Sequence, residues 1–332
     1  MRPLKITVTI ALPITFLGFI LLLWYVHTNI TRELAPGDLP FNIEKGSNLG
    51  DFSQSLISRN VIKQEWPLLL WATATGKATR IQAGEYQFPQ TTNLRSMLAQ
   101  VIDGKVINYS ITIIEGWTFS QIQDMLLKSE HLTDDISNLS ELELLKAIGS
   151  KSSNLEGLFF PDTYYSSLGH SSLEILKLAH DTMAGHLGIV WQQKTSESVV
   201  TTPYEALILA SIIEKESLID AERTLVSGVL SNRLRENLLL QTDPTIIYGL
   251  GDRFDGILRK SDLTTDGPYN TYTRKGLPPT PIANPGMKSL IAAVRPARTS
   301  KMFFVARGDG THEFSDTLEE HNIAVNKYQR TN

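Results

Sequence analysis

The sequence predicts an α+β protein built from an N-terminal transmembrane helix, a stretch of small strand–turn–helix units and a larger mixed α+β domain. Three observations carry this prediction: an uncharged apolar run near the N-terminus, a strand–turn–helix pattern that recurs, and a second half in which apolar helices alternate with short strand patterns and Gly/Pro-rich loops. The predicted segments are a tip with the anchor (1–28), a linker (29–40), the small units (41–126), a connecting segment (127–154) and the larger domain (155–332).

The composition excludes several classes of protein. Hydrophobic residues make up 42% and charged residues 20% of the 332 residues, so the chain can bury a sizeable core. The net charge is −4 and no long basic run occurs, which argues against nucleic acid as a ligand. There is no cysteine, no paired histidine motif and no phosphate-cradling loop. The sequence therefore predicts no disulfide, no metal site and no nucleotide cofactor.

The N-terminal apolar run predicts a membrane anchor. Residues 6–26 contain no charged side chain, and about 20 residues of helix cross the hydrocarbon layer of a bilayer. Trp24 and Tyr25 lie at the far end of this run, where interfacial aromatic residues belong. Arg2 and Lys5 precede the run, which predicts that the N-terminus is cytoplasmic and that the rest of the chain lies outside.

A cleaved signal peptide is the alternative interpretation of the same run. The apolar core of a signal peptide is usually shorter than residues 6–26. Residues 27–32 (HTNITR) also lack a clean small-x-small cleavage site. Both observations favour an uncleaved anchor.

A strand–turn–helix pattern occurs twice between residues 41 and 126. FNIEKGSNLGDFSQSL (41–56) and ITIIEGWTFSQIQDML (111–126) align without gaps. Each predicts a strand, a turn at Gly46 or Gly116, and a helix, with Asn48 as a helix cap in the first copy. Such units bind or position a ligand in some proteins and are plain scaffold in others.

An apolar helix is predicted from residue 203 onward. Thr202 is suited to the N-cap, Pro203 to the first helical position, and Glu205 to closing a capping box. The following residues 207–213 are apolar nearly all round, which predicts a buried helix. It leads into Glu-Lys-Glu at residues 214–216.

The two glutamates at the end of this helix fall on different faces. Glu216 continues the stripe made by positions 205, 208, 209, 212 and 213, whereas Glu214 does not. An apolar wall disfavours a charged carboxylate and raises its pKa, which is what a general acid needs near neutral pH. The alternative is that the helix surfaces here and that both glutamates are solvated.

The segments that follow predict a strand, a short helix and a long loop. Residues 238–242 predict a strand, and Asp243 with Pro244 predicts the cap and first residue of a short helix. Residues 267–286 form a long irregular stretch with amide, hydroxyl and aromatic side chains at 269–272, which suit a sugar-binding groove or a packed structural loop. The tail predicts strands at 303–305 and 312–314 around Gly308-Asp309-Gly310, and a closing helix over 318–328.

Four ordered motifs in this half carry a family resemblance. They are ALILASIIEKES, SGVLSNRLRENLLLQTDPTIIYGLG, PYNTYTRKGLPPTPIANPG and the FFVARGDGTHEFS…HN tail. Together they resemble the YceG-like endolytic murein transglycosylases (the MltG type), in order from about residue 155 to the end. The anchor and the strand–turn–helix units, which are LysM-like in that family, also fit.

The resemblance implies a membrane-anchored enzyme on the outer (periplasmic) side of the bacterial inner membrane that cuts nascent peptidoglycan glycan strands internally. The catalytic glutamate of the family maps onto Glu216, and Ser217 stands where the family often has threonine. Peptidoglycan synthases (penicillin-binding proteins) are the implied protein partners, and no cofactor is implied. The residues that match further motif positions, and that we expect to bind substrate at the cleft, are Gln241, Asp243, Tyr248, Asn270 and Tyr272.

The implied reaction uses one carboxyl group. Glu216 would protonate the bond between N-acetylmuramic acid and N-acetylglucosamine and then deprotonate the muramic acid C6 hydroxyl, leaving a 1,6-anhydro end. A lysozyme-like hydrolase is the enzymatic alternative, and it requires a second carboxylate such as Glu222 or Asp243. A non-catalytic, membrane-anchored protein that binds the cell wall is the alternative from another class.

Overall fold

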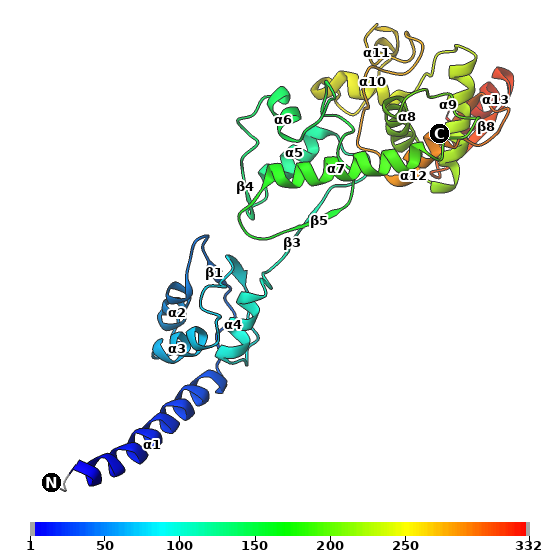
Figure 1. Cartoon of the computed structure of the whole chain (residues 1–332). Helices are drawn as coiled ribbons and strands as arrows, with labels where there is room; N and C mark the ends of the chain where they lie inside the picture. The colour runs from blue at the N-terminus through cyan, green and yellow to red at the C-terminus, as the bar shows by residue number, and fades with distance from the viewer. Residues whose placement is uncertain (1–3, 330–332) are drawn as a thin grey trace. The chain divides into compact units, whose positions relative to one another are not determined.

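The structure, a computed structural model, describes residues 4–329, with side chains described from residue 15 onward. The chain divides into two units (Figure 1). The first unit runs through residue 109 and includes residues 165–169. The second unit comprises residues 110–164 and the chain from residue 170 to the C-terminal end.

The first unit combines a long N-terminal helix with a small α/β core. Its elements are α1 (Leu4–Thr31), β1 (Phe41–Ile43), α2 (Leu49–Ser58), α3 (Trp66–Ala74), β2 (Gly84–Tyr86) and α4 (Leu94–Ile102). Strands β1 and β2 pair antiparallel, with Phe41 opposite Tyr86. The core of this unit gathers buried side chains from all three of its small helices, and from Val26 and Ile30 near the end of α1.

The predicted anchor, residues 6–26, lies within α1. The side chains of residues 6–14 lie outside the described part of the chain. Among the residues whose side chains are described, no helix combines the length and apolar character that crossing a membrane requires.

The second unit contains most of the helices. Its elements are β3 (Tyr109–Thr112), α5 (Phe119–Leu127), β4 (Leu132–Thr133), α6 (Glu141–Ala147), β5 (Thr163–Ser166), β6 (His170–Ser171), α7 (Ser172–Trp191), α8 (Pro203–Glu216), α9 (Asp220–Arg235), α10 (Asp243–Leu250), the 3₁₀ turn η1 (Gly251–Arg253), α11 (Lys260–Thr264), α12 (Met287–Val294), β7 (Phe303–Ala306), β8 (His312–Ser315) and α13 (Leu318–Tyr328). The strands form small two-stranded sheets: β3 with β5, β4 parallel to β6, and β7 antiparallel to β8. The mixed α+β class predicted from the sequence is confirmed.

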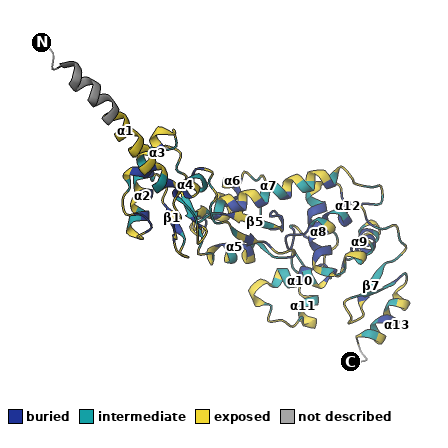
Figure 2. Ribbon diagram, turned by 90° about the horizontal axis from the view of Figure 1, so that it is seen from below, coloured by how far each residue is buried: buried dark blue, intermediate teal, exposed yellow. Residues whose placement is uncertain are grey.

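Helix α8 lies at the centre of this unit. Helix α12 packs against α7, α8 and α9, and α8 also contacts α7, α9 and α10. Every residue of α8 from Ala206 to Glu214 is buried (Figure 2), as its apolar sequence predicts. Because α8 is held on several sides, its last residue has a well-defined position.

Both predicted strand–turn–helix units are present. The first consists of β1 and α2, and Asn48 caps α2 in a capping box. The second consists of β3 and α5. The turns contain Gly46 and Gly116, whose φ angles of 92° and 78° lie in the left-handed region that favours glycine. The division between the two compact units, at residue 109, falls inside the range predicted for the small units, 41–126.

Two local predictions for residues 238–243 are wrong. Residues 238–242 do not form a strand, because Gln241 has a φ of 54° and its backbone N–H donates to the Thr271 carbonyl oxygen at 3.1 Å. Asp243 is the first residue of α10 and not its cap, since Thr242 occupies the N-cap position. The carboxylate of Asp243 is therefore not used to close the helix and remains exposed.

Candidate active site

Glu216 is the last residue of α8 and is partly exposed. The helix begins at the predicted N-cap Thr202, whose Oγ1 accepts from the Glu205 N–H at 3.1 Å. The predicted capping box is wrong, because the Glu205 carboxylate accepts from the Thr201 N–H and not from that of Thr202. It ends at Ser217, whose N–H donates to the Ile213 carbonyl oxygen at 3.0 Å and whose Oγ donates to the Ile219 carbonyl oxygen at 2.9 Å. These bonds end the helix sharply and leave the Glu216 side chain directed at a cleft.

The cleft beside Glu216 has a volume of about 470 Å³. Its walls come from the end of α8, from α9, from the segment before α10, from the 267–286 loop, and from β7, β8 and α13. Aromatic, amide, carboxyl and imidazole groups share the lining, which is Glu216, Arg233, Leu240, Gln241, Asp243, Tyr272, Phe303, Phe304, Val305, Ala306, His312, Leu318, His321, Asn322, Val325 and Gln329. Flat rings together with hydrogen-bonding groups suit a ligand with both C–H faces and hydroxyls.

The carboxyl of Glu216 holds its proton at neutral pH. Burial raises its pKa, and the negative charge of Asp243 raises it further, to about 8. A carboxyl group with such a pKa is mostly protonated at pH 7 and can act as a general acid. After giving up its proton it becomes a base in the same position.

Asp243 and Tyr272 are brought together although 29 residues separate them. The Tyr272 hydroxyl donates to Asp243 Oδ1 at 2.5 Å. Burial raises the pKa of Tyr272, and the bond to Asp243 raises it further, so the hydroxyl stays protonated as a donor. Asp243, with one carboxyl oxygen bonded to Tyr272, thus lies in the same cleft as Glu216.

Gln241 and Arg233 form a second polar group in the cleft. The Arg233 guanidinium donates to Gln241 Oε1, to the Leu239 carbonyl oxygen at 2.7 Å and to the Met302 carbonyl oxygen at 3.0 Å. It also lies 5.2 Å from the centre of the Phe303 ring. No carboxylate pairs with Arg233 among the described residues, and burial lowers its pKa. A buried cation of this kind leaves positive potential available to an anionic or polar ligand.

Asn270 holds the loop that carries Tyr272. Its Nδ2 donates to the carbonyl oxygens of Asp262, Leu263 and Thr265 at 3.0, 3.3 and 2.7 Å. Its Oδ1 accepts from the Tyr272 N–H at 2.8 Å. Asn270 is buried and is absent from the described lining of the cleft, so it positions Tyr272 from behind.

Tyr248 faces a different part of the second unit. Its ring packs edge-on against Tyr269, with the ring centres 4.9 Å apart. Its hydroxyl bonds to Glu156, a carboxyl whose pKa burial raises to about 7. Tyr248 is likewise absent from the described lining of the Glu216 cleft. Three of the five predicted substrate-binding residues, Gln241, Asp243 and Tyr272, therefore line the cleft.

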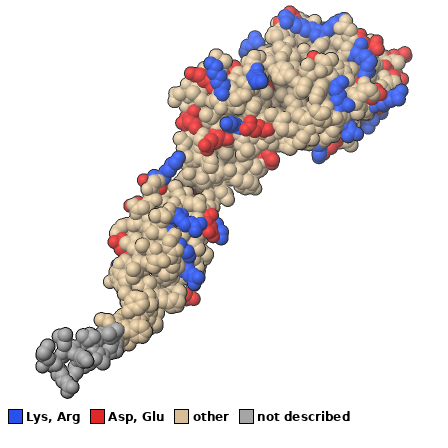
Figure 3. All heavy atoms as spheres, viewed as in Figure 1, with Lys and Arg blue, Asp and Glu red and all other residues tan. Residues whose placement is uncertain are grey.

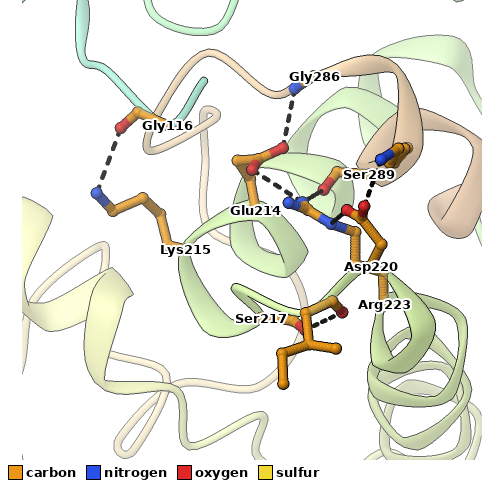
Figure 4. Close-up of polar contacts among 10 residues, drawn as sticks. Gly116, Glu214, Lys215, Ser217, Asp220, Arg223, Gly286 and Ser289 are labelled. Carbon is orange, nitrogen blue, oxygen red and sulfur yellow. Dashed lines mark hydrogen bonds and ion pairs between the residues drawn. The ribbon is translucent and has the colours of Figure 1, made fainter. Parts of the chain in front are cut away.

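Glu214, two residues before Glu216, forms a buried ion pair with Arg223. Its carboxylate accepts from Arg223 Nη1 at 2.8 Å and from the Gly286 N–H at 2.9 Å (Figure 4). Arg223 also donates to Ser289 Oγ. These bonds join α8, α9 and α12, so the role of Glu214 is structural, while Glu216 on the other face is left for the cleft.

Glu222, considered above as a second carboxylate, is also engaged. It accepts from the His312 backbone N–H at 3.2 Å, and the His312 Nδ1 lies 2.8 Å from its Oε2. Glu222 does not belong to the described lining of the cleft, whereas His312 does. Asp243 is therefore the carboxylate that shares the cleft with Glu216.

The tail contributes side chains that sequence reasoning did not single out. Phe303, Phe304, His312 and His321 all lie in the cleft wall. The sequence predicted β7, β8 and α13 but offered no reason to turn these faces toward Glu216. Arg233 was not predicted either, because basic residues near the C-terminal end of a helix are common and do not by themselves indicate a binding site.

A larger hollow lies at the other end of α8 and has a different character. It has a volume of about 670 Å³ and includes Glu205, Ile208, Leu234 and Leu277 in its lining. The Glu205 carboxylate accepts from the N–H and Oγ1 of Thr201 at 2.6 and 2.7 Å, and these bonds lower its pKa. Glu205 is therefore a poor proton donor at neutral pH.

Among the described residues, no cluster of three or more His, Asp and Glu side chains could hold a metal ion.

The arrangement at Glu216 suits general acid–base chemistry by one protonated carboxyl. The model of the YceG-like family matches residues 41–327, and the chain belongs to this family. It is 32% identical to an endolytic murein transglycosylase from Bacillus subtilis (strain 168), over 86% of this chain and 84% of the relative. It is 25% identical to an endolytic murein transglycosylase from Streptococcus pneumoniae (strain ATCC BAA-255 / R6), over 95% of this chain and 64% of the relative. A crystal structure of a YceG-like protein from Listeria monocytogenes is 28% identical and covers 88% of this chain and 99% of its own, with a TM-score of 0.52.

Proposed function

We propose that this protein is an endolytic murein transglycosylase, a lyase that cleaves peptidoglycan glycan strands, with Glu216 as its acid and base. The observation that carries the proposal is the protonated Glu216 carboxyl, with its pKa of about 8, in a cleft that can hold sugar rings. The family membership and the names of the relatives support the substrate class.

We propose a reaction that consumes no water. The Glu216 carboxyl protonates the oxygen that links C1 of N-acetylmuramic acid to N-acetylglucosamine, and that C1–O bond breaks. The resulting carboxylate removes the proton of the muramic acid C6 hydroxyl, and O6 bonds to C1. The products are a free hydroxyl on the released N-acetylglucosamine and a 1,6-anhydro end, and Glu216 regains its proton.

The groups around Glu216 support the charge changes of this reaction. Positive charge develops at C1 as the bond breaks, and the Asp243 carboxylate, held by Tyr272, is placed to stabilise it. The same negative charge keeps Glu216 protonated before the reaction. Phe303 and Phe304 offer flat faces to sugar rings, and Gln241 offers an amide.

We propose that α1 anchors the protein in the bacterial inner membrane, with the N-terminus inside and both units outside. The uncharged run of residues 6–26 and the basic residues before it support this orientation. An anchored enzyme of this kind would work on new strands beside membrane-bound peptidoglycan synthases. Alkaline extraction of cell membranes tests the anchor, because an integral protein stays in the membrane pellet and a peripheral protein is released.

We propose that the small α/β core of the first unit is LysM-like and holds the glycan. The order β1–α2–α3–β2 with β1 and β2 antiparallel supports this assignment. A hollow of about 470 Å³ beside the β1–α2 turn, with Asn42, Lys45 and Asp51 in its lining, is large enough for a sugar. Binding of isolated glycan strands by the Glu216→Gln protein, which retains this unit, tests the assignment by co-sedimentation.

Product analysis tests the catalytic proposal. Isolated glycan strands are digested with the full chain in detergent, and the products are analysed by mass. We expect 1,6-anhydro ends, and we expect Glu216→Gln to lower the rate by about 10²–10⁴-fold. Glu205→Gln, at the other end of the same helix, is the matched control and should retain activity.

Two other outcomes separate the alternatives. Hydrated reducing ends identify a lysozyme-like hydrolase, with Asp243 as the second carboxylate. If the wild-type protein releases no product and Glu216→Gln keeps full activity in cells, the protein is a non-catalytic cell-wall-binding protein.

A further inference from the structure

The large apolar side chains exposed on the first unit gather on two helices. On α1 they are Phe16, Leu17, Phe19, Ile20, Leu21, Leu22, Leu23, Trp24 and Tyr25, and on α3 they are Trp66 and Leu70. Among the described residues of this unit, Leu39 and Tyr165 are the large exposed hydrophobic residues found elsewhere. In Figure 3 the described part of α1 is drawn without any Lys, Arg, Asp or Glu atoms. The α3 residues therefore extend the apolar surface of α1 onto the folded core.

Helix α3 is fastened to α1 at the end of the apolar run. The rings of Tyr25 and Trp66 stack with their centres 5.3 Å apart and their planes 7° from parallel. The Tyr25 hydroxyl also donates to Gln64 Oε1 at 3.3 Å. Val26, the next residue of α1, and Ile30, about one turn beyond it, are buried in the core of the unit. Trp66 is therefore held at the same level along α1 as Tyr25.

Trp66 and Leu70 lie on one face of α3. They are four residues apart, so they sit one above the other on the helix surface. The exposed fractions of the two residues are 39% and 43%, whereas Leu68 and Ala72 on the opposite face are fully buried. An aromatic and an aliphatic side chain thus point away from the core beside an apolar helix.

Two cations lie close to this apolar surface. Arg32 and Lys63 line a small hollow of about 110 Å³ together with Tyr25 and Asn29. No carboxylate forms an ion pair with Arg32 or Lys63 in the part of the chain that the structure describes. Apolar and aromatic groups bordered by unpaired cations match the boundary between acyl chains and phosphate groups in a bilayer.

We propose that the first unit carries a membrane-interface collar, formed by Trp24, Tyr25, Trp66 and Leu70 with Arg32 and Lys63 on its rim, that binds the phospholipid surface around the anchor. The proposal rests on the proposed anchoring by α1. The apolar members of the collar enter the acyl chain boundary, and the cations contact lipid phosphates. Because α1 continues into the core of the unit, the collar holds this unit against the membrane surface.

The absence of cysteine from the chain makes the collar testable with single labels. Three exposed leucines serve as matched positions: Leu23 on α1, Leu70 on α3, and Leu142 on α6 of the second unit, with exposed fractions of 52%, 43% and 61%. Each is replaced by cysteine in the full chain and labelled with an environment-sensitive fluorophore. The proteins are placed in nanodiscs of phosphatidylglycerol and phosphatidylcholine, with and without a lipid that carries a nitroxide near the headgroup.

The proposal predicts a blue shift and nitroxide quenching for the labels at positions 23 and 70, and neither for the label at position 142. If the label at position 23 is quenched but the label at position 70 is neither quenched nor blue-shifted, the collar is overturned and the anchor remains. An unquenched label at 23 overturns the anchor, and the collar with it. Equal quenching at 70 and 142 also overturns the collar, because the membrane contact would not be specific to α3.

Discussion

Replacing Glu216 by glutamine should stabilise the second unit at neutral pH. The pKa of Glu216 is about 8 in the folded protein, against 4.5 for an unperturbed glutamate. Because the folded pKa is raised, the stabilising contribution of this carboxyl is fully present below pH 4.5 and is lost as the pH rises from 4.5 to about 8. At pH 7 ionisation favours the unfolded chain by about 3 kcal/mol. Glutamine has no proton to lose, so Glu216→Gln should gain roughly that amount at pH 7 and almost nothing at pH 4.

Urea unfolding of the full chain in detergent at the two pH values measures this difference, with Trp117 and Trp191 fluorescence reporting on the second unit. Glu205→Gln is a control of opposite sign on the same helix. Its bonds to Thr201 lower the pKa of Glu205, so removal of that carboxylate should destabilise the protein at neutral pH. An equal effect of Glu216→Gln at both pH values would refute the argument that Glu216 is protonated in the folded state.

Three further variants test the neighbours of Glu216. Asp243→Asn should move the alkaline fall of kcat/KM to lower pH, because the Asp243 charge is the second of the two causes that raise the pKa of Glu216. An unmoved alkaline limb contradicts this coupling. Arg223→Met leaves the buried Glu214 carboxylate unpaired and should cost about 3–5 kcal/mol in urea unfolding, and an unchanged midpoint contradicts the structural role of the pair. Gln241→Gly fits the positive φ but removes the oxygen that accepts from the buried Arg233 guanidinium, so the free energy of unfolding should fall by about 1–3 kcal/mol. We also expect kcat/KM to fall about tenfold or more, and full activity contradicts a role at the cleft.

Much of the fold follows from local sequence. The caps at Asn48 and Thr202, the buried helix after Pro203 and the β7–β8 hairpin were all predicted and are present. These features depend on residues within a few positions of one another, so they can be inferred without knowledge of distant contacts. The predicted strand at 238–242 fails because a distant residue, Thr271, fixes the backbone of Gln241.

The sequence by itself determined the helix that ends at residues 214–216, the cap at Thr202 where it begins and the separation of its two glutamates onto different faces. Only the tertiary structure decided what each glutamate meets. Glu214 accepts hydrogen bonds from Arg223 on α9 and from the Gly286 N–H before α12. Glu216 lies in a cleft with Asp243 and with side chains of β7, β8 and α13. The physical reason is that a pKa depends on burial and on nearby charge. Both are set by residues far away in the chain, and helical spacing alone cannot supply them.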